Sequence, residues 1–189
     1  VLYQQEDFTF IPEKVLRFSP IYGTSWFEVI DYDKDGDLDI VTVNGDNADK
    51  TFIHKPYHGL RIHINDGTNH FEEKYFYPLN GATRFTTDDF DQDGDYYFGV
   101  ISTFPDYEKY PDYSFVYLEN TNSSAFEFSP TIIEHSMDSR WFLLDKGDID
   151  SDGDTDIVLS SFTYVFTPVP KTITDLWQEK NVDILVLEN

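Results

Sequence analysis

The chain has 189 residues, which suffices for one domain with a sizeable core or for part of a larger domain. Its formal net charge of −23 argues against nucleic acid and anionic lipid as partners, because both are bound through Lys and Arg. Cysteine is absent, which excludes disulfides and thiolate metal sites, and no apolar run approaches the roughly 20 residues needed for membrane insertion as a helix.

The first predicted elements are two strands, Val1–Gln5 and Phe8–Val15. Within the second, the sequence FTFIP has the same alternation as FEFSP, which begins at Phe126. The downstream copy follows a strand in a longer repeating pattern. We therefore assign residues 1–20 to the end of a repeat that precedes the rest of the chain.

Three nearly identical acidic segments follow: DYDKDGDLDIV from Asp31, DFDQDGDYYFGV from Asp89 and DIDSDGDTDIVL from Asp148. Their starts are 58 and 59 residues apart, and such a fixed long period indicates a repeat architecture. We call the first nine residues of each segment an acidic loop and count positions from its first aspartate.

The acidic loops have the composition of calcium sites. Carboxylates at alternate positions of a tight loop can turn inward together, and the glycine at position 6 permits the sharp bend. Calcium accepts six to eight oxygens at flexible angles, whereas magnesium demands stricter octahedral geometry. The loops contain fourteen of the 36 acidic residues, and three divalent ions would cancel six charges. The predicted metal ligands are Asp31, Asp33, Asp35, Asp37, Asp39, Asp89, Asp91, Asp93, Asp95, Asp148, Asp150, Asp152, Asp154 and Asp156.

At Asp37 and Asp154 we expect the backbone carbonyl to be the ligand. The second loop departs from the pattern, because its position 9 is Tyr97, which offers no carboxylate. We therefore expect two strong calcium sites and one weaker site.

Each loop leads directly into a run of β-branched or aromatic residues, which predicts a strand. An EF-hand loop would instead continue to a glutamate at position 12 and into a helix, and dockerin-type loops also lead into helices. Four strands are predicted per repeat. First strands are Ser25–Ile30, Arg84–Thr87 and Arg140–Leu144; second strands are Asp39–Val43, Tyr97–Ile101 and Asp156–Leu159; third strands are Leu60–Ile64, Phe115–Glu119 and Val182–Glu188; fourth strands are Phe71–Phe76 and Phe126–Ile133.

Four antiparallel strands in about 58 residues favour an all-β fold of β-propeller blades, which stack around an axis. The predicted blades are residues 21–80, 81–137 and 138–189, the last without a fourth strand. Closed propellers typically have at least four blades. We therefore expect about three blades of a larger propeller.

The repeat resembles the FG-GAP/VCBS family, whose shared core D-x-D-x-D-G-D-x-D followed by Ile-Val stands intact at Asp31–Val41 and Asp148–Val158. This resemblance implies propeller blades in which the acidic loop joins the first two strands and binds Ca²⁺. Trp26-Phe27 and Trp141-Phe142 stand where the family has Phe-Gly, and Val43-Asn44-Gly45 replaces its later Gly-Ala-Pro. These departures favour the bacterial secreted branch over the integrin-like one.

The connections between second and third strands, near residues 44–59, 104–114 and 162–181, are long and rich in aromatic residues, including Phe166 in the third. In a blade they emerge on the face opposite the acidic loops, where long loops on a rigid scaffold often bind ligands. They can also simply pack over neighbouring blades. A short helical turn is expected at Asp175–Lys180. The candidate ligand-binding residues are His54, Tyr57, His58, Tyr107, Tyr110 and Trp177.

The sequence thus favours a calcium-binding extracellular propeller segment that binds protein or carbohydrate at these connections and packs against further blades or a neighbouring chain. We expect the ions to be structural, since catalytic metals keep an open position beside an acid or base. Two alternatives remain open. One is the body of a lyase-like enzyme acting on polysaccharides, with His58, Tyr57 and Arg84 as candidates, and the other is a structural subunit of a surface assembly.

Overall fold

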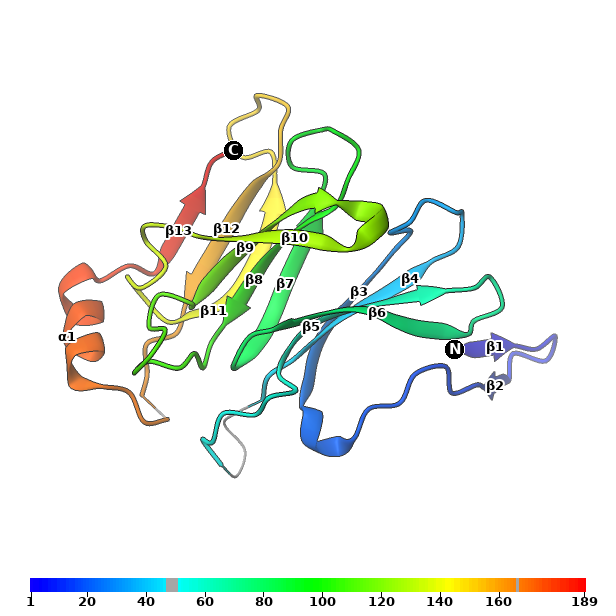
Figure 1. Ribbon diagram of the computed structural model, residues 1–189, viewed down its shortest axis with the longest axis horizontal. Helices are drawn as coiled ribbons and strands as arrows, with labels where there is room; N and C mark the ends of the chain where they lie inside the picture. The colour runs from blue at the N-terminus through cyan, green and yellow to red at the C-terminus, as the bar shows by residue number, and fades with distance from the viewer. Residues whose placement is uncertain (47–50, 166) are drawn as a thin grey trace.

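The computed structural model describes residues 1–46, 51–165 and 167–189, so Phe166 and part of the first connection lie outside the described residues. In the described chain, the strands form four antiparallel sheets, and three larger ones follow one another across the molecule (Figure 1). The predicted all-β class is confirmed. No sheet in this part of the chain closes on itself.

Each larger sheet is a meander in which every strand pairs with the next one in sequence. Strand order therefore equals chain order, as the repeat predicts. The first sheet contains β3 (Thr24–Ile30), β4 (Asp39–Asn44), β5 (Gly59–Asn65) and β6 (Phe71–Pro78); the second contains β7 (Ala82–Asp88), β8 (Tyr97–Ser102), β9 (Phe115–Asn122) and β10 (Glu127–Ile132); the third contains β11 (Trp141–Gly147), β12 (Asp156–Ser161) and β13 (Ile184–Leu187).

The three sheets share a local irregularity near the start of their first strand. The register shifts between Thr24 and Trp26 in β3, between Ala82 and Arg84 in β7, and between Trp141 and Leu143 in β11. A shift of this kind bends a strand and increases its twist. The three first strands are therefore bent alike, at the spacing of the sequence repeat.

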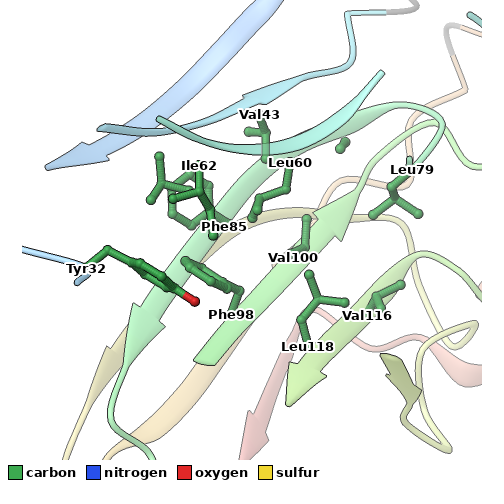
Figure 2. Packing of buried hydrophobic residues seen from close by; sticks show 12 residues of the cluster. Tyr32, Val43, Leu60, Ile62, Leu79, Phe85, Phe98, Val100, Val116 and Leu118 are labelled. Atoms are coloured by element: carbon green, nitrogen blue, oxygen red, sulfur yellow. The ribbon is translucent and has the colours of Figure 1, made fainter. Parts of the chain in front are cut away.

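Two apolar clusters join the sheets. The first lies between the first and second sheets, where Val43 and Leu60 face Phe85 and Phe98 (Figure 2). The second joins the second and third sheets and includes Phe115, Trp141 and Leu159. The inner strands are almost fully buried. β8 contributes to both clusters, whereas the other face of β5 is covered by the N-terminal segment, where Phe18 contacts His63 and Tyr22 lies under Arg61. Close packing also explains Gly99, where an added Cβ would lie 3.0 Å from Ile157 Cδ1.

The N-terminal strands differ from the prediction. β1 (Leu2–Gln4) and β2 (Phe10–Pro12) pair only with each other and are shorter than the predicted Val1–Gln5 and Phe8–Val15. Their hairpin closes through a turn in which the Gln5 and Phe8 backbones hydrogen-bond and Phe8 takes a φ of 64°. Among the described residues, no third strand pairs with them.

The third connection contains α1 (Lys171–Lys180), which is ten residues long and therefore exceeds the turn predicted at Asp175–Lys180. Ile173 and Trp177, four residues apart, form its buried face, and an ion pair of 2.6 Å joins Lys171 to Asp175 on its exposed face. Short 3₁₀ turns, η1 (Pro20–Tyr22) and η2 (Ser123–Ala125), complete the structure. In the described part of the chain, no helix has the length and apolar character needed to cross a membrane.

Candidate functional site

The three acidic loops lie at the same end of the three larger sheets, each joining a first strand to a second strand (Figure 1). Strand pairing closes each loop at its base. The closing pairs are Ile30 with Asp39, Asp88 with Tyr97, and Gly147 with Asp156. The same segment of each repeat is therefore presented on one face of the molecule.

The backbone of the loops is also the same in all three copies. Position 4 takes a left-handed conformation, with φ of 60° at Lys34, 60° at Gln92 and 69° at Ser151. The glycine at position 6 has φ near 100° in every loop, a region that side chains disfavour. Its N–H donates to the carboxylate of position 1, at distances of 3.1 Å for Gly36 to Asp31, 2.9 Å for Gly94 to Asp89 and 3.2 Å for Gly153 to Asp148.

This turn brings three carboxylates of each loop together. One oxygen from each member of a set lies within 4.8 Å of the others, a spacing compatible with oxygens that share a cation at 2.3–2.6 Å. The sets are Asp31, Asp33 and Asp39; Asp89, Asp91 and Asp93; and Asp148, Asp150 and Asp156.

The other predicted ligands lie at the edges of these sets. The carboxylates of Asp35 and Asp152 each accept a hydrogen bond from the N–H two residues on, that of Asp37 and Asp154, respectively. Asp95 forms a 3.9 Å ion pair with Lys34 of the first loop. These contacts shape the turn.

The charge balance of the loops favours a cation. Asp31 Oδ1 and Asp89 Oδ1 are buried and have no hydrogen-bond partner among the described residues. In the third loop, a hydrogen bond with Asp152 raises the pKa of Asp154 to about 6. Burial raises the pKa of Asp39. Crowded carboxylates of this kind are relieved by a proton or, more completely, by a divalent ion.

Position 9 has a second role that sequence reasoning did not find. Asp39 is fully buried and accepts hydrogen bonds of 2.8 Å from the N–H groups of Tyr32 and Asn65. Asp156 repeats this arrangement with Ile149 at 2.9 Å and Asn189 at 3.0 Å. This aspartate therefore ties its loop to the end of the third strand, whether or not it also binds a cation.

Asparagines at the end of the third strands complete the link. The side-chain amide of Asn65 donates to the carbonyl of Leu38 at 3.2 Å, and that of Asn120 donates to the carbonyl of Tyr96 at 3.1 Å. Both acceptors occupy position 8 of their loops. The signal in the sequence was the recurrent Asn that follows each third strand, at Asn65, Asn120 and Asn189.

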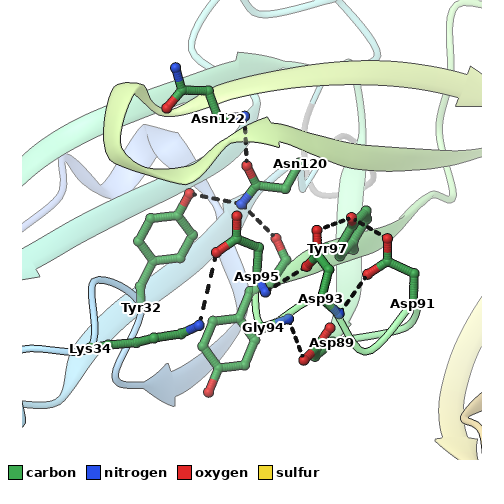
Figure 3. Close-up of polar contacts among 11 residues, drawn as sticks. Tyr32, Lys34, Asp89, Asp91, Asp93, Gly94, Asp95, Tyr97, Asn120 and Asn122 are labelled. Carbon is green, nitrogen blue, oxygen red and sulfur yellow. Dashed lines mark hydrogen bonds and ion pairs between the residues drawn. The ribbon is translucent and has the colours of Figure 1, made fainter.

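Tyr97 replaces the position-9 aspartate of the second loop by a different contact. Its hydroxyl donates to Asp91 Oδ2 at 2.8 Å and lies 3.3 Å from Asp93 Oδ2, as Figure 3 shows. The second loop therefore balances part of its negative charge with a buried donor of its own. Lys146 of β11 also approaches, at 2.9 Å from Asp88.

The candidate ligand-binding residues of the connections fall into two groups. Tyr57 and Trp177 serve in packing: Tyr57 stacks on Tyr22 at 4.7 Å between ring centroids, and Trp177 is buried, with its Nε1 donating to the Met137 carbonyl at 3.1 Å. The other residues line two neighbouring cavities. His54 and Tyr107 line a cavity of about 520 Å³, and His58 and Tyr110 line one of about 340 Å³.

The three residues considered for a lyase-like reaction have different surroundings. Arg84 lies over the Trp26 ring, 4.6 Å from its centroid. The two residues belong to β7 and β3, the strands that lead into the second and first acidic loops. Tyr57 is held in its stack with Tyr22, and His58 lines the smaller cavity. Tyr57 and Arg84 are thus both engaged in aromatic packing, and neither is a lining residue of that cavity.

Comparison with protein-family models, with curated proteins and with solved structures found no match.

Proposed function

We propose that this chain is a segment of a calcium-stabilised β-propeller that acts outside the cell as a binding or adhesion module. The observation that carries the proposal is the threefold recurrence of one loop conformation with converging carboxylates, at the same end of three successive sheets. A solvated acidic turn would not need the same left-handed residues and the same convergence in each copy.

Propeller blades account for the arrangement of the sheets. Each larger sheet is an antiparallel meander, and the bend near the start of the first strand recurs with the repeat. The sheets also pack side by side through apolar clusters, as adjoining blades do. The resemblance to FG-GAP/VCBS repeats supports the same architecture and a calcium ion in each loop.

Calcium suits the loops better than magnesium does. Each loop offers three carboxylates and further carbonyl oxygens in an open turn, which fits a coordination number of six to eight. The unpartnered oxygens of Asp31 and Asp89 would gain a ligand bond. Extracellular calcium modules work with dissociation constants of about 10⁻⁴ to 10⁻³ M, which supports an extracellular location for sites of this exposed kind.

Binding at the opposite face is supported by the two cavities among the connections. Their lining combines aromatic rings, prolines and a few polar groups, a composition typical of ligand sites. A protein or carbohydrate partner is therefore proposed there, and packing against further blades or a neighbouring chain is proposed for the flanks of the sheets.

Calcium titration tests the proposal directly. Isothermal titration should show calcium binding by the intact chain, with two stronger sites and one weaker site. At calcium tenfold above a dissociation constant, each site adds about 1.4 kcal/mol of stability. The melting temperature should then rise by about 3–6 °C per site.

Variants locate the ions. Asp33→Asn and Asp150→Asn should each remove one strong site, because both carboxylates belong to the converging sets. Asp183→Asn removes the same charge at an exposed position outside the loops and should leave the titration unchanged. Melting that is the same in calcium and in EDTA, or a loss of binding in Asp183→Asn equal to that in Asp33→Asn, would contradict the proposal.

A further inference from the structure

His58 is a buried histidine without hydrogen-bond partners. It lies just before β5, its residue is 1% exposed, and neither ring nitrogen has a partner among the described residues. Burial lowers the pKa of His58 to about 4, so the ring is neutral at pH 7. A neutral imidazole has one N–H donor and one acceptor. Leaving both unsatisfied in the interior costs free energy, which a bound ligand would recover.

The ring borders the cavity of about 340 Å³, which has the size of a small-molecule site. Its lining has a polar part and an apolar part. His58, Asn80 and Asp106 contribute polar groups, whereas prolines and the tyrosines Tyr110 and Tyr113 contribute apolar surface. The two tyrosine rings lie 5.1 Å apart, and Tyr110 is 51% exposed, so it forms an accessible part of the wall.

The charged groups at the cavity already have polar partners within the protein. Asp106 is 7% exposed, and its Oδ2 lies 3.2 Å from His54 Nδ1. Its Oδ1 accepts hydrogen bonds from the N–H groups of Glu108 at 3.2 Å and Lys109 at 3.1 Å. The Lys55 ammonium, also at the cavity, donates to the Asp46 carbonyl at 3.1 Å. A neutral ligand would leave all of these contacts in place.

We propose that this cavity binds a neutral saccharide unit, with its hydroxyls bonded to the His58 ring nitrogens and a C–H face against Tyr110. A sugar ring combines both kinds of surface, because hydroxyls donate and accept around its edge while its faces are apolar. The proposal rests on the proposed function and gives the binding module a ligand class. The ring nitrogens are covered from water, so a hydroxyl reaches them after a bordering side chain moves.

The adjoining cavity extends the site. It has a volume of about 520 Å³ and shares Pro105 and Asp106 with the smaller one. Its lining includes His54 and the exposed ring of Phe52. The buried Asp106 carboxylate thus stands between two spaces, each large enough for a sugar unit. An oligosaccharide should consequently bind more tightly than a monosaccharide.

The test uses the intact chain with histidine labelled by ¹⁵N, in saturating calcium. Glucose, galactose, mannose and N-acetylglucosamine, together with their β- or α-linked disaccharides, are titrated while the imidazole nitrogens and backbone amides are followed by NMR. At least one neutral sugar should shift the His58 ring nitrogens and the amides of Asn80 and Tyr110. Its disaccharide should bind at least tenfold more tightly.

Variants separate this site from the general fold. His58→Leu and Tyr110→Ala should each weaken binding at least tenfold, and His58→Leu should keep the calcium-dependent rise in melting temperature. Tyr164→Ala is the matched control, since this exposed tyrosine of the third connection lines neither cavity. Choline, a cation, and glucuronate, an anion, are titrated in the same way. The proposal would be overturned if only these charged compounds caused shifts, if the shifts lay away from His58, or if no sugar caused a shift. Calcium binding by the same sample shows whether the proposed function stands without it.

Discussion

A tyrosine hydroxyl and an aspartate carboxylate occupy position 9 of neighbouring acidic loops. The aspartate adds negative charge to its loop, whereas the tyrosine stabilises the negative charge already present. Asp39 adds a carboxylate to its set, whereas the Tyr97 hydroxyl donates a hydrogen bond to Asp91 and approaches Asp93. Burial raises the pKa of Tyr97, so the hydroxyl keeps its proton at every ordinary pH. The second loop is therefore the one that least needs a cation to stay folded.

Tyr97→Phe removes this donor and keeps the ring, which stacks on Tyr117 at 6.0 Å. Without calcium, the variant should lose about 1–2 kcal/mol of unfolding free energy, because hydrogen bonds to charged groups are among the stronger ones. In calcium, the loss should shrink as the ion takes over the carboxylates. Denaturant unfolding in EDTA and in calcium measures both values, with Tyr117→Phe as control. An equal loss in both conditions would mean that the hydroxyl does not substitute for an ion.

His63 gives the protein a predictable acid sensitivity. It is buried on β5 beside Phe18 and Thr42, and burial, followed by the nearby charge of Arg61, lowers its pKa to about 4. The unfolded chain binds the proton near pH 6.5, so the unfolded state holds more protons between these values. Stability from this group is complete above pH 6.5 and falls towards pH 4, by at most about 1.4 kcal/mol per pH unit.

Replacing the histidine should therefore flatten the pH profile. Unfolding free energies of wild type and His63→Leu, measured from pH 7 to pH 4 in EDTA, should differ progressively as the pH falls. His70→Gln provides the control, because the His70 side chain is 76% exposed. If the wild-type and His63→Leu profiles ran parallel, the buried neutral state of His63 would be refuted.

At the scale of elements, an acidic loop joins two strands in sequence and also contacts a third strand of the same sheet. In the first and third sheets, the buried aspartate at position 9 of the loop also holds the end of the third strand, and in the first sheet Asn65 adds a second bond to the loop. Sheet and loop therefore form a single hydrogen-bonded unit. This coupling explains why an ion bound at the loop would stabilise a whole sheet.

Asp39→Ala tests the coupling. It leaves the N–H groups of Tyr32 and Asn65 without their acceptor in a buried place, so it should cost about 3 kcal/mol even in EDTA. Asp33→Ala, which is exposed, should cost stability only when calcium is present. Chemical unfolding with and without calcium distinguishes the two. A cost for Asp39→Ala that disappears in EDTA would show that position 9 acts through the ion alone.

The elements of the larger sheets were predictable because their signals are local. β-branched and aromatic runs lie directly after tight acidic turns, so predicted strands such as Asp39–Val43 and Tyr97–Ile101 fall within β4 and β8. The turn itself follows from alternating aspartates and a glycine at position 6. The spacing thus indicated that carboxylates of each loop could converge, but it did not distinguish the members of the sets, since Asp93 belongs to one and Asp35 and Asp152 do not.

Other features depend on tertiary contacts that could not be predicted from the sequence. The length of α1 depends on packing, since Ile173 and Trp177 bury one face of the helix. That β1 and β2 pair only with each other is likewise a matter of tertiary arrangement. The hydroxyl of Tyr97 bridges two carboxylates only because the strand aims it there. The unsatisfied ring of His58 likewise depends on which residues surround it in space.

At the scale of the whole molecule, a net charge of −23 makes stability depend on ionic conditions. Self-repulsion of this size is screened as the Debye length falls from about 30 Å at 0.01 M salt to about 10 Å at 0.1 M. Adding NaCl in EDTA should therefore raise the melting temperature, and the rise should be smaller in calcium if bound ions neutralise part of the loops, as proposed. Thermal melts across a salt series in both buffers measure this. The same salt response in both would show that calcium does not relieve the repulsion.

Hydrogen bonds from their own backbone hold the acidic loops in shape, and residues such as Lys34 already adopt their left-handed conformation. A calcium ion would therefore bind to carboxylates that are already in position. The entropy of ordering these turns is lost when the polypeptide folds and not when the metal is captured. Ion uptake should accordingly be fast and accompanied by little change in the circular dichroism spectrum.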